Sequence, residues 1–125
     1  MVNSRLMVAL ALCGGLFGMA PALAHGEAKA RHGGVVQEAK DLSFELVPQA
    51  GGAAIYIEDH GKPLAVAGIG GKLTVLNGAD KREAELKPAG NRLEAQGVKL
   101  AAGSKAVASV MLADKQTLTL RFVVK

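Results

Sequence analysis

The sequence predicts an all-β fold for residues 35–125: an antiparallel β-sandwich with an immunoglobulin-like layout and seven to nine short strands. Three observations support this prediction. Apolar and polar residues alternate in several short runs, turn signals recur about every eight to twelve residues, and no amphipathic helix pattern is present. A small β-barrel is the alternative arrangement of the same strands.

The clearest alternation lies early in this region. Leu42, Phe44 and Leu46 share one face of a predicted strand, while Ser43 and Glu45 lie on the other. This pattern is typical of a strand that is buried on one side only. The predicted strands are residues 35–37, 42–46, 54–58, 64–67, 73–76, 81–87, 92–95, 106–112 and 116–124.

Turn residues separate these runs. Asn77-Gly78 between two alternating runs is a strong hairpin signal. Residues 113–115 join the last two runs, which we expect to form an antiparallel C-terminal hairpin. The other predicted breaks are residues 38–41, 48–52, 58–63, 88–91 and 97–103.

Residues 1–24 have the pattern of a secretory signal peptide, with a basic start at Arg5, an apolar run and an A-x-A motif that ends at Ala24. The apolar run is shorter than the roughly 20 residues that span a bilayer. We therefore expect export to the periplasm, cleavage after Ala24 and no stable membrane insertion. A lipoprotein acylated at Cys13 is the alternative, although Leu12 is larger than the small residue that usually precedes such a cysteine.

Charge and composition argue against several functions. Loss of Arg5 with the signal lowers the net charge from +4 to +3, and the remaining basic residues are scattered. Phe44, Tyr56 and Phe122 are the only aromatic residues after residue 24, so no stacking platform for nucleic acid is present. The same region has no cysteine, which excludes thiolate ligands and disulfides.

Catalysis lacks a recognisable set of residues. The serines after residue 24 have no G-x-S-x-G setting, and no cysteine nucleophile is available. The carboxylates fall at outward strand positions, where we expect a solvated face. We therefore predict that the protein is not an enzyme.

Residues 25–34 are expected to form a flexible arm that carries the best metal-ligand candidates, His25 and His32. Cleavage after Ala24 would make His25 the first residue, so its α-amino group and imidazole could chelate one ion, and an amine of pKa about 7.7–8 gives up its proton readily. His32-Gly33-Gly34 could add an imidazole and backbone amide nitrogens, and Glu27 an oxygen. Tetragonal nitrogen and oxygen ligation favours Cu(II), with Zn(II), Ni(II) or Co(II) as alternatives.

His60 is a weaker metal candidate, because a histidine between Asp59 and Gly61 is more often a turn residue. If residues 35–37 and 42–46 form a hairpin, His32 should lie at one end of the sheet and His60 at the other. Strands of this length separate the two ends by roughly 17–20 Å. A three-histidine site would then require the arm to fold back, or a second molecule.

Four segments carry a resemblance to a known group of proteins: His32-Gly33-Gly34, residues 44–47, residues 56–63 and Arg121-Phe122. Together they resemble small proteobacterial periplasmic proteins of heavy-metal resistance, and are similar to the N-terminal β-domain of metal-efflux periplasmic adaptor proteins. The resemblance implies a periplasmic β-sandwich linked to copper, zinc, cobalt or nickel. The helical hairpin and lipoyl-like modules of an adaptor are missing, so we do not expect this chain to bridge an efflux pump.

Two functions follow as hypotheses. The first is a periplasmic protein that binds a divalent transition metal ion, Cu(II) above all, and buffers it or hands it over in metal resistance. The second is a non-catalytic interaction module that docks on an efflux-system or other envelope protein through a sheet edge.

Overall fold

The computed structural model describes residues 29–125, which form nine β-strands and no helix. The predicted signal peptide, its cleavage after Ala24, and His25 lie outside the described residues. The strands are β1 (Val35–Ala39), β2 (Leu42–Gln49), β3 (Gly52–Asp59), β4 (Lys62–Pro63), β5 (Gly70–Asn77), β6 (Asp80–Ala89), β7 (Arg92–Gln96), β8 (Lys105–Met111) and β9 (Thr117–Val123).

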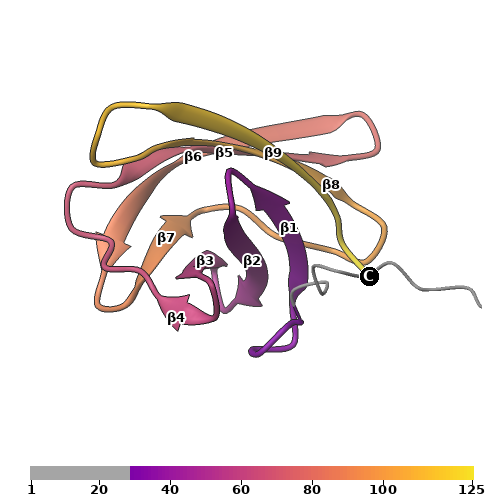
Figure 1. Ribbon diagram of the computed structural model, residues 1–125. Helices are drawn as coiled ribbons and strands as arrows, with labels where there is room; N and C mark the ends of the chain where they lie inside the picture. The colour runs from indigo at the N-terminus through magenta and orange to yellow at the C-terminus, as the bar shows by residue number, and fades with distance from the viewer. Residues whose placement is uncertain (1–28) are drawn as a thin grey trace, which may run out of the picture.

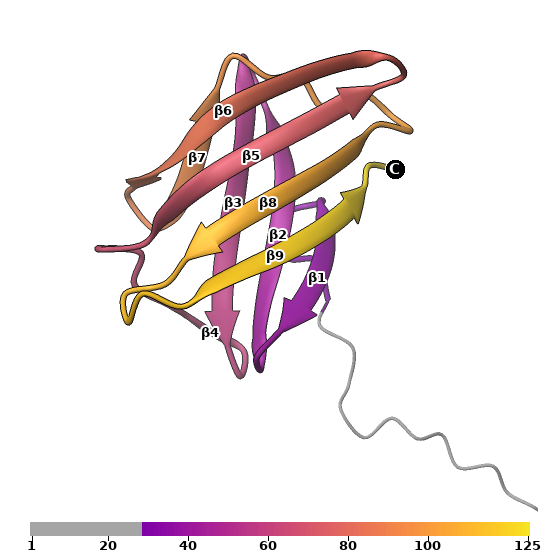
Figure 2. The ribbon, with the colours of Figure 1, turned by 90° about the horizontal axis from the view of Figure 1, so that it is seen from above.

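The strands pair in the order β1-β2-β3-β7-β6-β5-β8-β9, with β4 paired to β3, and every pair is antiparallel. β6 joins the two halves, since its first part pairs with β5 and its last part with β7. Figure 1 shows β5, β6, β8 and β9 curving over the remaining strands. In Figure 2, β9 lies beside β1, and the two edge strands are in contact although they do not pair.

The sheet is therefore nearly closed, and its shape is that of a barrel. This confirms the all-β, antiparallel prediction, and of the two predicted arrangements the small barrel is the one that the structure has. The nine strands of residues 29–125 match the upper end of the predicted number.

The core follows the alternation of the sequence. Phe44 on β2 and Phe122 on β9 are 0% and 2% exposed, so each half of the sheet contributes one large aromatic side chain to a shared interior. Burying such a side chain contributes about 2–3 kcal/mol, which makes these rings main contributors to the core. The other large, fully buried side chains are Leu46, Ile55, Ile57, Leu73, Leu86, Leu93, Val75 and Val110.

Several boundaries differ from the prediction, and β4 (Lys62–Pro63) lies inside the predicted break at residues 58–63. Pro48 and Pro88 lie inside β2 and β6, opposite Ala53 and Leu93, where breaks were expected. Each proline lies within two residues of its strand's end, where the missing N–H costs the ladder little. The strand predicted at residues 64–67 is wrong: Leu64 donates one hydrogen bond to Ile57, and the chain then leaves the sheet.

Two tight turns lie side by side at one end of the barrel. Lys40 and Asp41 connect β1 to β2, and His60 and Gly61 connect β3 to β4, all four with positive φ. The turns are adjacent because Leu42 pairs with Asp59. Within residues 29–125, no helix is long and apolar enough to cross a membrane.

Candidate functional site

Residues 31–34, which we call the strap, precede β1 and fold back over the outer face of β2 and β3. Gly33 permits this reversal because its φ of +79° lies in the left-handed region, which favours glycine. Gly34 permits the close approach, since a Cβ there would collide with the backbone carbonyl of Leu46. The structure describes residues 29–34 of the predicted flexible arm, and the strap is the part of them that is attached to the sheet.

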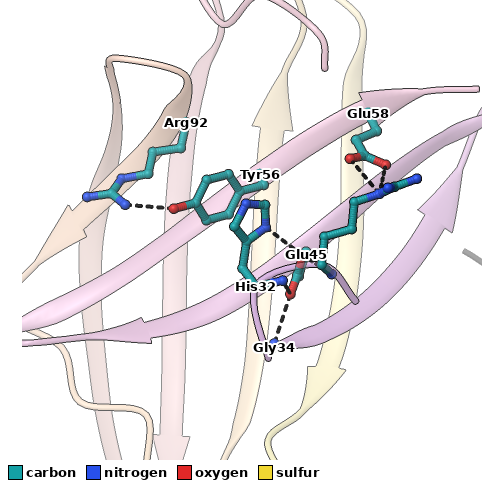
Figure 3. A network of polar contacts seen from close by, with 7 residues as sticks. His32, Gly34, Glu45, Tyr56, Glu58 and Arg92 are labelled. Carbon is teal, nitrogen blue, oxygen red and sulfur yellow. Dashed lines mark hydrogen bonds and ion pairs between the residues drawn. The ribbon is translucent and has the colours of Figure 1, made fainter. Parts of the chain in front are cut away.

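Glu45 on β2 is the attachment point. Its Oε1 accepts hydrogen bonds from the backbone N–H of Arg31 at 3.0 Å and from Nδ1 of His32 at 3.0 Å. Its Oε2 accepts from the backbone N–H groups of His32 and Gly34, both at 2.8 Å. Four donors therefore surround one carboxylate, and each oxygen receives two of them (Figure 3).

The strap also buries Glu45, which is 6% exposed. The sequence predicts an outward position for this residue, and that is confirmed, but the expectation of a solvated face is wrong for it. Burial alone would raise the pKa of Glu45, yet the hydrogen bonds from His32 and the three amides outweigh it and lower the pKa. Glu45 is therefore an ionised carboxylate, stabilised by a ring of fixed donors.

His32 is oriented from two sides. A carboxylate without a proton can only accept, so Nδ1 of His32 carries the hydrogen of the contact with Glu45. The imidazole lies flat on the ring of Tyr56, with ring centroids 3.6 Å apart and planes 5° from parallel. Nε2 has no hydrogen-bond partner within residues 29–125, and the side chain is 37% exposed.

The polar contacts continue along the same face of the sheet (Figure 3). Arg92 on β7 donates from Nη1 to the Tyr56 hydroxyl at 2.7 Å. It also donates from Nε and Nη2 to Glu94, at 2.8 and 2.6 Å. On the other side, Nε of Arg31 contacts both carboxylate oxygens of Glu58, at 3.0 and 3.1 Å. These contacts fix the rings and carboxylates around His32 in one arrangement.

His60 lies apart from this cluster. Its Nδ1 contacts Asp59 at 2.6 Å, and its side chain is 78% exposed. It lines an open hollow of about 550 Å³ between the two adjacent turns and the chain before the strap, together with Arg31 and Lys29. The lining mixes both signs of charge, so it does not select one class of ligand.

The structure thus corrects the expected separation of His32 and His60. The hairpin of β1 and β2 is confirmed, but His32 does not lie at the far end of the sheet, because the strap returns it to Tyr56 in the middle of β3. Tyr56 is four residues from His60, or roughly 13 Å along a strand. The two histidines have different carboxylate partners, and no three His, Cys, Asp or Glu side chains of residues 29–125 are grouped to hold a metal ion.

The sequence did not reveal the roles of Glu45, Tyr56 and Arg92. One signal was present: Glu45 and Tyr56 fall on outward positions of neighbouring strands, and they pair directly. The covering strap could not be derived from that alternation. Comparison of the chain with protein-family models, curated proteins and solved structures gives no match.

Proposed function

We propose that this is an exported, periplasmic protein that binds a divalent transition metal ion, with Cu(II) as the first candidate. His32 is the anchored ligand and His25 the second. The observation that carries the proposal is the contact between Nδ1 of His32 and the buried carboxylate of Glu45.

A carboxylate on one imidazole nitrogen is the usual support of a metal-binding histidine. Metal-ligating histidines donate their other ring N–H to such a partner, which fixes the tautomer and makes the ligating nitrogen more basic. With Nδ1 engaged by Glu45, the lone pair of the neutral ring is on Nε2 of His32. Stacking on Tyr56 restricts rotation of the ring, so Nε2 needs little ordering when an ion arrives.

His32 alone cannot hold an ion tightly, and His25 offers the complementary donors. Seven residues span up to about 23 Å, so the α-amino group and imidazole of His25 are within reach of the exposed edge of His32. Glu27 adds an oxygen donor in the same segment. In such a site His32 is the fixed ligand, and the other donors come from residues 25–27. This arrangement suits reversible binding of the ion, as buffering or transfer of a metal requires.

Copper titration of the protein that begins at His25 tests the proposal. We expect about one Cu(II) per chain, and an affinity that falls roughly 10-fold or more in His25→Ala and in His32→Ala. His60→Ala is the matched control, since that imidazole lies on an exposed turn away from Glu45. Unchanged titrations in both His25→Ala and His32→Ala would contradict the proposal, and competition with Zn(II), Ni(II) and Co(II) would rank the ions.

The second candidate is an interaction module that docks on an efflux-system or other envelope protein. The edges of β1 and β9 favour it: the two strands contact each other without pairing, so a partner strand that enters between them could pair with their backbone groups. Capture of partners from a periplasmic extract, with and without chelator, separates the two functions. A partner retained equally with and without chelator supports docking that is independent of metal.

A further inference from the structure

Glu45 is hydrogen-bonded to the nitrogen atoms that a copper ion would need for a planar site at His32-Gly33-Gly34. Such a site closes chelate rings between Nδ1 of the imidazole and nearby backbone amide nitrogens, because Nε2 points away from the backbone. Here Nδ1 of His32 lies 3.0 Å from Oε1 of Glu45, and the amide of Gly34 lies 2.8 Å from Oε2. The amide of His32 donates to the same Oε2 at 2.8 Å.

An amide nitrogen binds a metal ion only after it loses its proton. In this structure the amides of His32 and Gly34 donate those protons to a carboxylate that is only 6% exposed to solvent. Taking them away would leave a buried carboxylate without these hydrogen-bond partners, which is unfavourable. The ion would also have to lift the strap from the sheet, because the hydrogen bonds to Glu45 come from its backbone and the ring of His32.

We propose that Glu45 is a positioning residue that restricts His32 to coordination through Nε2 and keeps the amides of His32-Gly33-Gly34 out of the ligand set. The inference rests on the proposed function for the ion that Nε2 receives. Glu45 thereby affects which metal ions the site prefers, since Cu(II) and Ni(II) are the ions that gain most from displacing amide protons. An ion bound through Nε2 of His32 lacks the amide ligands and is released more readily.

The experiment compares wild type, Glu45→Gln and Glu58→Gln, all beginning at His25, with one equivalent of Cu(II). Visible circular dichroism and electron paramagnetic resonance report amide ligation, because amide nitrogens move the copper absorption to shorter wavelength and make it optically active. Glu58→Gln is the matched control: it removes a carboxylate from the same face that contacts Arg31 and does not contact His32. The double variant Glu45→Gln/His32→Ala shows whether a new signal depends on His32.

We expect the amide signature to appear in Glu45→Gln, to disappear in the double variant and to be absent from wild type and Glu58→Gln. An amide signature in wild type that is lost in His32→Ala, or the absence of the signature from Glu45→Gln, overturns the inference. If wild type binds no copper while Glu45→Gln gains the signature, the inference stands and the proposed function falls. If Glu45→Gln does not fold, Glu45→Asp replaces it, because a carboxylate on a side chain one methylene shorter keeps the charge but cannot reach all four donors of the strap.

Discussion

Glu45 and Tyr56 face each other across β2 and β3, and the imidazole of His32 contacts both, by a hydrogen bond to one and a ring stack on the other. One pair of neighbouring strand positions therefore fixes a residue that lies outside the sheet. The carboxylate sets which ring nitrogen carries the hydrogen, and the phenol ring sets the plane of the imidazole. The stability of the strap and the orientation of His32 have the same origin.

Glu45→Gln should lower the free energy of unfolding by about 2 kcal/mol, because a neutral amide cannot accept from all four donors and leaves buried N–H groups unpaired. Urea unfolding measures this change. Glu58→Gln, which removes a surface ion pair, should cost less than about 1 kcal/mol. Equal losses in the two variants would contradict the role assigned to Glu45.

Stability should depend on pH through Glu45. Its pKa is lowered in the folded protein from the ordinary 4.5, so its contribution is fully present above pH 4.5 and is lost as pH falls through the folded-state pKa. The difference in unfolding free energy between wild type and Glu45→Gln should therefore shrink below pH 4.5. Urea unfolding at a series of pH values checks this, and a difference that grows with acidity would refute it.

Alanine substitutions at the two glycines of the strap should differ. Gly34→Ala places a Cβ against the Leu46 carbonyl and should destabilise the protein by about 3 kcal/mol, as overpacking does. Gly33→Ala meets no atom within 4 Å, so it should lose only the about 1 kcal/mol that a side chain costs at positive φ. Thermal unfolding of both variants gives the order, and a larger loss for Gly33→Ala would show that the strap does not lie as described.

Tyr56 should act on His32 through its ring and not through its hydroxyl. Tyr56→Phe removes the contact with Arg92 but keeps the stack, whereas Tyr56→Leu removes both. We expect Tyr56→Leu to be less stable than Tyr56→Phe by about 1 kcal/mol. The ring protons of His32 in the NMR spectrum should keep their ring-current shift in Tyr56→Phe and lose it in Tyr56→Leu; a loss in both would point to the hydroxyl.

The alternation of apolar and polar side chains was enough to predict most strands, because one face of the sheet is buried inside the barrel and the other faces outward. Leu42, Phe44 and Leu46 point inward as expected, and so do the alternating apolar residues of β9. Choosing between a sandwich and a barrel required knowing that β6 pairs with β5 in one part and with β7 in the other, which no local pattern contains.

The site was harder to predict, for a physical reason. His32 was identified from its glycine neighbours, but its partner lies 13 residues away, at a position that alternation assigns to solvent. A period-2 pattern states which face a residue takes and not what covers that face. Glu45 became a buried residue only because Gly33 reverses the chain, and a Gly-Gly step alone does not specify the direction of a turn.

The closeness of the strap to Glu45 also couples ion binding to the melting temperature. An ion that takes Nε2 of His32 binds the folded chain as it stands and should raise the melting temperature by mass action. An ion that takes the amides competes with Glu45, and in the unfolded chain it has no such competitor, so it should lower the melting temperature. The sign of the thermal shift therefore separates the two modes of coordination in one measurement.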